Sequence, residues 1–299
     1  MIALLACTAS GPDTGWTPEQ GWTNDEPPEP DTIFEGLADP RGLLVVDGSY
    51  VIAEMDAGRV VSIDGGGLEV LAEGLDEPYM LAATTEGLLV TERSGRVLHI
   101  GEETTTLAEG LNTPGRIVSE GGTAWWLDEG TGELWTAELA TGEASVLATL
   151  DTPVGLSGTE DGVLVASAGG CDCVVRITED GTQTVVVEVD ENPVDVLATD
   201  EGVFLSTQSH NWPYGGWIYL IEDGTAEQLS YSPPKPSWLA ANEANLYWMT
   251  SEVIVSTPFS GGTYEPVAIL TAPGDLVANE DSVTWTDRQR GELLTVPVR

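Results

Sequence analysis

The sequence has little positive charge: 10 Lys and Arg residues stand against 50 Asp and Glu, and the formal net charge is −40 at pH 7. Lys235 is the single lysine. Nucleic-acid phosphates are bound through Lys and Arg, so this balance argues against a nucleic-acid partner. It also argues against docking on an anionic membrane through surface charge. The simplest interpretation is a solvated acidic surface, and a surface that collects cations is the alternative.

Helical patterns and long apolar runs are also missing. Apolar residues spaced at i, i+3, i+4 and i+7 are almost absent, and no stretch is long enough to form a transmembrane helix. Instead, a short segment that opens with proline recurs along the chain, and successive opening prolines are 36 to 43 residues apart. These prolines are Pro40, Pro78, Pro114, Pro153, Pro193, Pro236 and Pro273. An apolar residue stands three positions after each of these prolines. A period near 40 with short β-like runs predicts the blades of a propeller.

One unit, residues 78–113, shows how a blade is composed. Four short runs rich in apolar and β-branched residues are expected to form strands at 79–84, 87–92, 96–100 and 104–108. The segments between them contain Gly, Ser, Thr and Glu, which is turn chemistry. The other units repeat this order, so the sequence predicts four strands in each blade.

The last unit contains only three strand-like runs before Arg299. Residues 32–40 align with residues 70–78, the outer strand and following proline of another unit. We therefore predict an all-β, seven-bladed β-propeller over residues 32–299, closed by an N-terminal strand that joins the last blade. Closure of this kind removes exposed sheet edges.

Several phrases resemble known propeller families. The segments 126–128, 247–250 and 283–287 resemble the second-strand phrase of YWTD and NHL-type propellers, and the seven units are similar to the virginiamycin B lyase-like group. The resemblance implies the architecture of residues 32–299 but not one function, because propellers include binders, scaffolds, hydrolases and lyases. For the lyase-like group it implies a histidine base beside a metal-bound ligand. His210 is the only candidate for that base, and no second histidine is expected beside it.

The N-terminal residues 1–7 end in a Leu-Leu-Ala-Cys sequence that resembles a lipobox, with Cys7 as the lipidated residue. The apolar run before Cys7 is shorter than that of an ordinary signal and no basic residue precedes it, so the true translation start stays open. Residues 8–31 are acidic and rich in proline and are expected to be a tether. We expect a bacterial envelope lipoprotein that faces the periplasm or the exterior. A cytosolic protein with a chance match is the alternative.

Candidate ligand contacts lie on one rim, where the loops after the second strands and before the first strands should meet. The residues two positions after each opening proline are expected near the channel mouth: Gly42, Met80, Arg116, Gly155, Asp195, Trp238 and Asp275. The loop 207–216 is longer than its counterparts. The candidate ligand-binding rim therefore consists of Arg116, Asp128, His210, Asn211, Trp212, Tyr214, Trp238 and Arg288. Glu92, Asp128 and Asp172 are further candidates to hold a hard cation through oxygen.

Cys171 and Cys173 allow three interpretations. A turn after Gly169 and Gly170 would bring them within disulfide range, and two remaining cysteines suit a compartment outside the cytoplasm. Free thiols are the second interpretation. The third is a zinc site formed by Cys171, Cys173 and His210.

Two functions remain open. The first is a non-enzymatic binding or scaffold propeller, expected to be a monomer without a cofactor, whose rim contacts an envelope protein or glycan and which touches the membrane only through its lipid. The second is a lyase or lactone hydrolase that depends on a divalent metal, with His210 as the base and rim carboxylates on the metal. A catalytic residue is predicted only for this second function.

Overall fold

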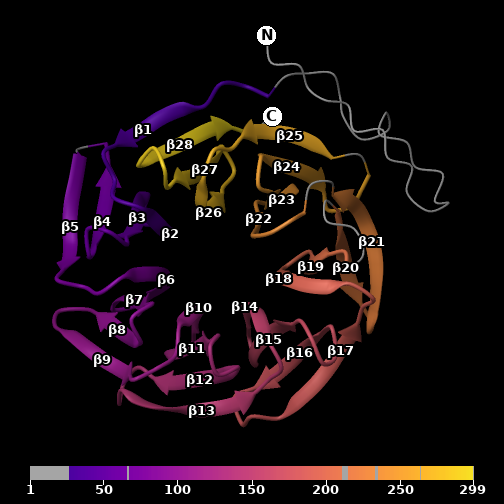
Figure 1. Ribbon diagram of the computed structural model, residues 1–299, viewed down its shortest axis with the longest axis horizontal. Helices are drawn as coiled ribbons and strands as arrows, with labels where there is room; N and C mark the ends of the chain where they lie inside the picture. Colours follow the sequence, from indigo (N-terminus) through magenta and orange to yellow (C-terminus); the bar gives the residue numbers. More distant parts are fainter. Residues whose placement is uncertain (1–26, 66, 211–214, 233–234, 263, 299) are drawn as a thin grey trace.

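The structure is a computed structural model that describes residues 27–65, 67–210, 215–232, 235–262 and 264–298. These residues form seven antiparallel sheets of four strands arranged in a ring (Figure 1). Within these ranges no helix has the length and apolar character needed to cross a membrane. The prediction of an all-β, seven-bladed propeller is confirmed.

The first three blades follow the order of the chain from the channel outwards. Blade 1 contains β2 (Pro40–Val46), β3 (Ser49–Glu54), β4 (Arg59–Asp64) and β5 (Gly67–Glu73). Blade 2 contains β6 (Pro78–Thr84), β7 (Gly87–Glu92), β8 (Arg96–Ile100) and β9 (Thr104–Glu109). Blade 3 contains β10 (Pro114–Glu120), β11 (Thr123–Asp128), β12 (Glu133–Glu138) and β13 (Glu143–Thr149).

The next three blades repeat the pattern. Blade 4 contains β14 (Pro153–Thr159), β15 (Gly162–Ser167), β16 (Cys173–Thr178) and β17 (Gln183–Glu188). Blade 5 contains β18 (Asn192–Thr199), β19 (Gly202–Gln208), β20 (Gly216–Glu222) and β21 (Thr225–Ser232). Blade 6 contains β22 (Leu239–Ala241), β23 (Asn245–Met249), β24 (Val253–Pro258) and β25 (Glu265–Ile269).

Blade 7 closes the ring with strands from both ends of the propeller. It contains β26 (Pro273–Ala278), β27 (Ser282–Asp287) and β28 (Glu292–Pro297), and its outer strand is β1 (Asp31–Glu35). β1 pairs antiparallel with β28, from Asp31 opposite Thr295 to Glu35 opposite Glu292. The Leu37 N–H then donates to the Gly291 carbonyl, 2.9 Å away. The closing strand therefore lies where the alignment of residues 32–40 with residues 70–78 predicted it.

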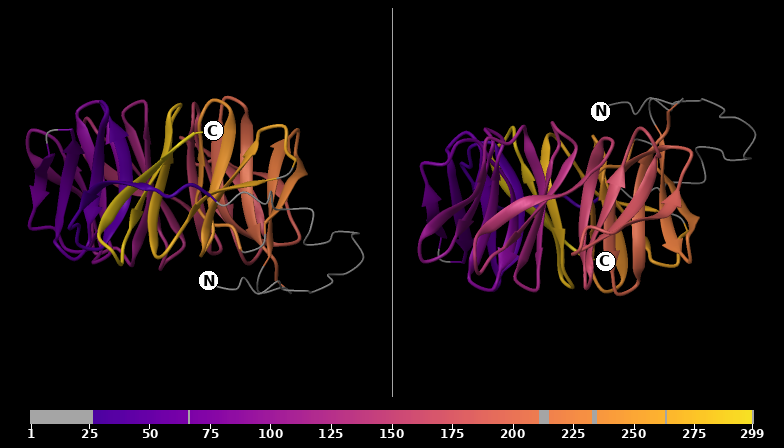
Figure 2. Two further views of the ribbon diagram at one scale, coloured as in Figure 1. Left: turned by 90° about the horizontal axis from the view of Figure 1, so that it is seen from above. Right: turned by 90° about the horizontal axis from the view of Figure 1, so that it is seen from below.

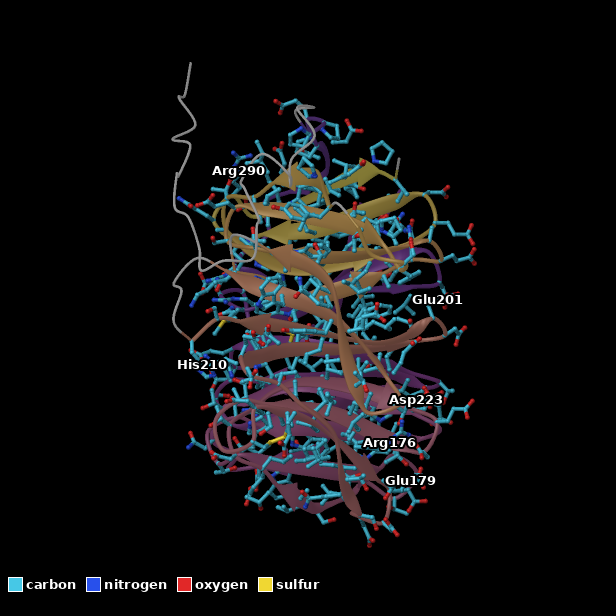
Figure 3. The ribbon with its side chains drawn as sticks, turned by 90° about the vertical axis from the view of Figure 1, so that its right-hand side faces the viewer. Arg176, Glu179, Glu201, His210, Asp223 and Arg290 are labelled. Carbon is cyan, nitrogen blue, oxygen red and sulfur yellow. A yellow bond between two sulfur atoms is a disulfide. The ribbon has the colours of Figure 1, made fainter. Side chains whose placement is uncertain are left out.

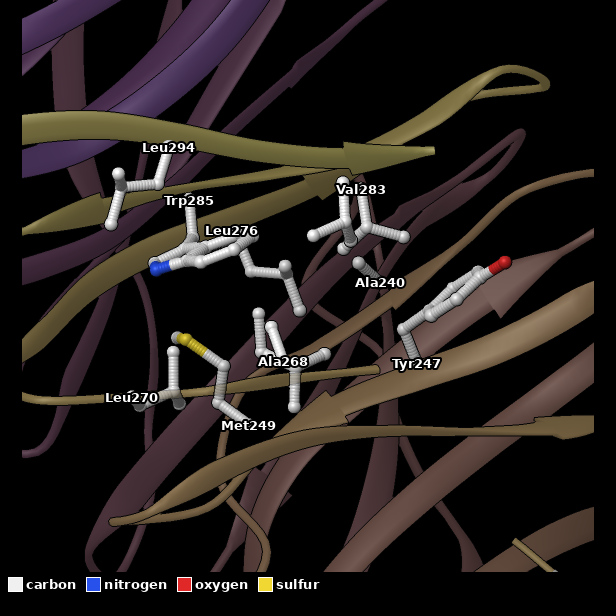
Figure 4. Packing of buried hydrophobic residues seen from close by; sticks show 11 residues of the cluster. Ala240, Tyr247, Met249, Ala268, Leu270, Leu276, Val283, Trp285 and Leu294 are labelled. Atoms are coloured by element: carbon white, nitrogen blue, oxygen red, sulfur yellow. The ribbon is translucent and has the colours of Figure 1, made fainter. Parts of the chain in front are cut away.

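The core lies between the blades rather than inside a single sheet. Side chains of blades 6 and 7 interdigitate in one such layer, where Trp285, Met249 and Leu276 are buried together (Figure 4). Equivalent layers lie between other neighbouring blades, as at Trp126, which packs with Met80 between blades 2 and 3. Each blade is apolar on both faces because both faces meet a neighbour, and this explains the continuous apolar runs of the sequence.

The chain enters each inner strand through a repeated turn. The residue before the opening proline has a left-handed backbone at Asp39, Glu77, Thr113 and Thr152, with φ between 49° and 71°. Its carbonyl accepts a hydrogen bond from the first residue after the second strand, as in Arg93 N–H to Glu77 O at 3.0 Å. This bond offsets the conformational cost of a left-handed non-glycine residue. It also fastens the two loops that form one rim of the ring.

Candidate functional site

The inner strands all begin at the same end of the ring, which we call the proline rim. The second strand of each blade ends there, because Pro40 pairs with Glu54, Pro78 with Glu92 and Pro114 with Asp128. Seen from the side, the strands run from this rim to the opposite rim (Figure 2). The loops that the sequence placed on one rim therefore do share it.

Basic residues gather on the proline rim. Of the nine Lys and Arg residues in the described ranges, only Arg176 reaches the opposite rim, where its guanidinium pairs with Asp161 at 2.9 Å. The others lie at strand ends or in loops of the proline rim: Arg41, Arg59, Arg93, Arg96, Arg116, Lys235, Arg288 and Arg290. In Figure 3, His210 and Arg290 lie at one end of the ring, and Glu179, Glu201 and Asp223 at the other. The two rims of this acidic chain therefore differ in their number of basic residues.

Carboxylates at the ends of second strands are structural. Glu54 and Glu92 are buried, and each accepts a backbone N–H of the loop that leads into the inner strand, from Ala38 and Asp76 at 2.7 Å. The second oxygen of Glu92 meets the Arg96 guanidinium at 2.5 Å. These groups hold the rim loops in place, and Glu92 is therefore not available as the open cation ligand considered from the sequence.

Asp128 occupies the same structural position in blade 3. Its side chain is 1% exposed, and Oδ2 accepts the Asn112 N–H at 2.8 Å. Asp128 therefore lies beneath the rim and not on the ligand-facing surface that was predicted for it from the sequence. The reason is the register of β10 and β11, which directs the last residue of the second strand into the loop of its own blade.

The positions two residues after the opening prolines bring one guanidinium, of Arg116, and two carboxylates, of Asp195 and Asp275, to the channel mouth. Arg116 Nη2 lies 2.8 Å from Asp195 Oδ2. Burial raises the pKa of Asp195 and of Asp275, although the Arg116 charge acts in the opposite direction on both. Asp195 accepts N–H bonds from Val196 and Leu239, so it joins blades 5 and 6.

Trp238 extends across this mouth. Its indole packs against the apolar cluster of blades 6 and 7 and also against the cluster that contains Met80 and Trp126 of blades 2 and 3. The Arg116 guanidinium carbon lies 5.0 Å from the centre of the indole ring. The structure therefore brings Arg116, Asp195 and Trp238 together, three of the residues that stand two positions after an opening proline.

A cavity of about 250 Å³ lies at this mouth. We call it the mouth cavity; it is lined by Tyr79, Met80, Arg116, Glu129, Val154, Val194 and Trp238. The guanidinium carbon of Arg93 lies 4.1 Å from the centre of the Tyr79 ring. Arg93 Nη1 in turn lies 2.7 Å from Glu129 Oε2. No pattern in the sequence marked Tyr79 as a candidate contact. Its signal was the position directly after the opening proline, which it shares with Val154 and Val194.

Cys171 and Cys173 are joined by a disulfide, with their Cα atoms 5.2 Å apart. Asp172 between them has a left-handed backbone with φ of 45°. The two sulfurs are bonded to each other, so in this state neither is the thiolate that the zinc alternative requires. His210 Nε2 lies 3.4 Å from Asp172 Oδ2, which places the two rim loops side by side.

The remaining candidates are separate from the mouth cavity. Arg288 donates through Nε to Asp39 Oδ1 at 3.0 Å, at the seam between blades 7 and 1. Among the described residues no group of three or more His, Cys, Asp or Glu side chains is arranged to hold a metal ion. Four candidates lie outside the described residues: Cys7, Asn211, Trp212 and Tyr214.

No protein-family model and no curated protein matches the sequence. Solved structures match its fold. Virginiamycin B lyase from Staphylococcus aureus superposes with a TM-score of 0.75 at 15% identity, over 91% of this chain and 99% of that one. A gluconolactonase from Xanthomonas campestris gives 0.55 at 14% identity, over 90% and 89%. A nidogen/laminin complex gives 0.51 at 17% identity, over 65% and 80%. The similarity to lyase-like and YWTD-type propellers is confirmed for the fold, which enzymes and protein-binding propellers share.

Proposed function

We propose that this chain is a non-enzymatic binding propeller of the bacterial cell envelope, and that its proline rim contacts an envelope protein or glycan. The observation that carries the proposal is the mouth cavity. Its lining combines aromatic and aliphatic walls with a few polar groups, which is typical of a recognition site. Its two cationic neighbours, Arg93 and Arg116, are held by Glu129 and Asp195, so they are fixed for recognition.

The structural carboxylates give further support. Glu54, Glu92 and Asp128 are committed to backbone N–H groups of the rim loops. These hydrogen bonds hold the rim loops in one conformation, and a rim held in this way binds a partner with little loss of conformational freedom. Protein partners of similar propellers, as in the nidogen/laminin complex, are consistent with this use of the fold.

The proposal is tested by capture on the immobilised full chain, followed by reconstitution with the purified component. Tyr79→Ser removes one wall of the mouth cavity, and Val185→Ser, at an exposed position of the outer strand β17, is the matched control. We expect the identified component to bind the wild type and the control, and to bind Tyr79→Ser at least about tenfold more weakly. Equal binding by both variants would remove the proline rim as the site.

A second candidate function is a metal-dependent lyase or lactone hydrolase. The contact of His210 with Asp172 favours it, because a carboxylate can orient a histidine base. Turnover of a lactone with an added divalent metal, lost in His210→Ala while the melting temperature is unchanged, would replace the binding proposal with this one. Equal absence of turnover in both proteins keeps the binding proposal.

The envelope location is proposed from Cys7. A lipid on this cysteine would retain the chain in the membrane fraction. The acidic surface of the chain does not itself favour binding to an anionic membrane. Intact-mass measurement of the chain expressed in a bacterium should show an acylated N-terminal cysteine. Cys7→Ser should move the protein to the soluble fraction, and a membrane-bound Cys7→Ser protein would contradict the anchor.

A further inference from the structure

A groove with a volume of about 330 Å³ opens between the outer parts of blades 6 and 7. Two of its walls are exposed prolines, Pro258 at the end of β24 and Pro297 at the end of β28. Val267 and Val298 also line it, and both are half-buried against the apolar cluster between the two blades. The groove, which we call the entry groove, is therefore a place where this cluster reaches the surface.

The entry groove lies where the described chain begins. Pro28 lines it, three residues before β1. Figure 1 shows this start of the chain beside β25 and the C-terminus. Asn245 pairs with Pro258 and Ser282 with Pro297, at the strand ends that lie away from the proline rim. The groove therefore opens towards the rim opposite the proline rim.

The two exposed prolines distinguish this place from the rest of the ring. Only blades 6 and 7 have a third strand that ends on proline. The third strands of the other blades end on Asp64, Ile100, Glu138, Thr178 and Glu222. Three blades thus have a carboxylate where the entry groove has a proline ring, in a chain with a net charge of −40. Adjoining apolar groups at the surface of so acidic a chain are typical of a contact site.

The chain ahead of the entry groove contains a repeated aromatic motif. Residues 1–26 lie outside the described residues, and they include Gly-Trp-Thr at 15–17 and again at 21–23. Trp22 is six residues before Pro28, and six residues of extended chain span at most about 20 Å. Because Pro28 itself lines the groove, the indole of Trp22 is within reach of it.

We infer that the entry groove binds the indole of Trp22, so that the propeller holds the end of its own tether. Proline rings pack on aromatic rings, as they do when proline-rich segments bind aromatic grooves, and here the groove supplies the prolines. Ser256 and Glu265 also line the groove, and their oxygens can accept the indole N–H. The ring thus finds apolar walls and an acceptor in one place.

The covalent connection favours this occupant over a separate molecule. A ring that is attached six residues away has an effective concentration on the order of millimolar, so a weak affinity is sufficient to dock it. A second copy of the chain would bring a further net charge of −40 to the contact, and this repulsion opposes association.

Docking of Trp22 would hold the segment ahead of β1 against the ring and leave residues 8–21 as the free part of the tether. With a lipid on Cys7, as proposed above, the tether would then depart from the side of the ring away from the proline rim. The proline rim would remain accessible to a partner. The docking itself does not depend on what the proline rim binds.

The experiment is fluorine NMR of the full chain labelled with 5-fluorotryptophan. Trp16→Phe and Trp22→Phe each remove one resonance and so assign the two tryptophans of the tether. The shift of a resonance between H₂O and D₂O measures the access of solvent to that ring. We expect the isotope shift of Trp22 to be at most about half that of Trp16, because the docked form should be the major one at this effective concentration.

Pro297→Asp tests the groove as the site of docking. It introduces an acidic residue like those at the same strand end in blades 1, 3 and 5, which the fold accommodates there. We expect the isotope shift of Trp22 to rise to that of Trp16. Ser260→Asp is the matched control, because Ser260 is exposed in the loop between β24 and β25 and does not line the groove. If Pro297→Asp lowers the melting temperature, Pro258→Asp on the other wall takes its place.

Three outcomes would overturn the inference. The first is an isotope shift of Trp22 equal to that of Trp16 in the wild type. The second is a protected Trp22 that neither proline variant releases, because the ring would then be docked elsewhere. The third is protection that is lost on dilution, which would assign the groove to a second copy of the chain. None of these results bears on the proline rim, which Tyr79→Ser tests separately.

Discussion

Asp275 Oδ2 accepts the backbone N–H of Leu43 at a distance of 3.0 Å. The two residues are 232 positions apart in the chain, and the bond joins the inner strand of blade 7 to the inner strand of blade 1. The other oxygen of Asp275 accepts the Leu276 N–H at 2.9 Å. One carboxylate thus fastens the seam of the ring from the channel side, while β1 closes the same blade from outside.

The first prediction concerns this seam. Asp275→Ala would leave the N–H groups of Leu43 and Leu276 without their acceptor, so we expect a loss of about 1–3 kcal/mol in the free energy of unfolding. Asp275→Asn keeps one acceptor and should lose less. Denaturant unfolding measures both, with the exposed Asp281→Asn in the same blade as the control. A loss in Asp275→Ala no larger than that in the control would contradict the role of the bond.

The second prediction is a pH dependence. Burial raises the pKa of Asp195 and Asp275 above the ordinary value of 3.8, so the folded chain holds these two protons more tightly than the unfolded chain. Their contribution to stability is full below pH 3.8 and is lost as the pH rises through the raised folded pKa. Acidification from neutral pH towards pH 3.8 should therefore increase the contribution of Asp195 and Asp275 to stability.

The measurement is the melting temperature as a function of pH, at high salt to screen the surface charge. The double variant Asp195→Asn, Asp275→Asn should show a smaller gain on acidification than the wild type. Asp281→Asn should retain the wild-type slope. A double variant with the full wild-type slope would show that other carboxylates are responsible.

The third prediction concerns a close approach of two inner strands. A Cβ atom on Gly155 of β14 would lie 2.8 Å from Cα of Asp195 in β18. Because the atom that it meets belongs to the backbone, a rotation of a side chain cannot relieve the clash. We expect Gly155→Ala to cost about 1–3 kcal/mol in the free energy of unfolding. Gly158→Ala in the same strand meets nothing within 4 Å and is the matched control. Similar stabilities for the two variants would exclude this strand contact as a constraint.

The fourth prediction concerns the closing strand. Removal of the chain through Gly36 takes away β1 and exposes the edge of β28, whereas removal through Pro30 leaves β1 intact. An exposed strand edge recruits other chains. The shorter protein should therefore be less stable and should form oligomers in light scattering, and the longer one should remain as the full chain does. A monomeric shorter protein of unchanged stability would contradict the closure.

The architecture could be predicted because it follows from local spacing. The prolines from Pro40 to Pro273 and the apolar runs behind them repeat at nearly one blade length, and each blade needs only its neighbours to bury both faces. The strands of residues 78–109 have almost the predicted bounds for this reason. The alignment of residues 32–40 with residues 70–78 gave the closing strand by the same logic.

The candidate site was predicted only in part, because its chemistry depends on the direction of single side chains. Arg116 and Trp238 were candidates by their distance from a proline, but their contact across the channel joins blades 3 and 6. Asp128 looked like an exposed rim acid and is a buried acceptor for Asn112. The role of Tyr79 emerged only with Arg93 and Glu129 beside it.

The sequence by itself determined the number of blades, the closure and the excess of acidic groups, since each of these is a sum or a repeat along the chain. The tertiary structure decided which charges meet. Arg116 selects Asp195 and stacks on Trp238 because the ring brings the starts of its inner strands to one narrow channel. Their spacing from the opening prolines placed all three residues at the channel mouth, but which of them pair depends on the directions of the side chains in the closed ring.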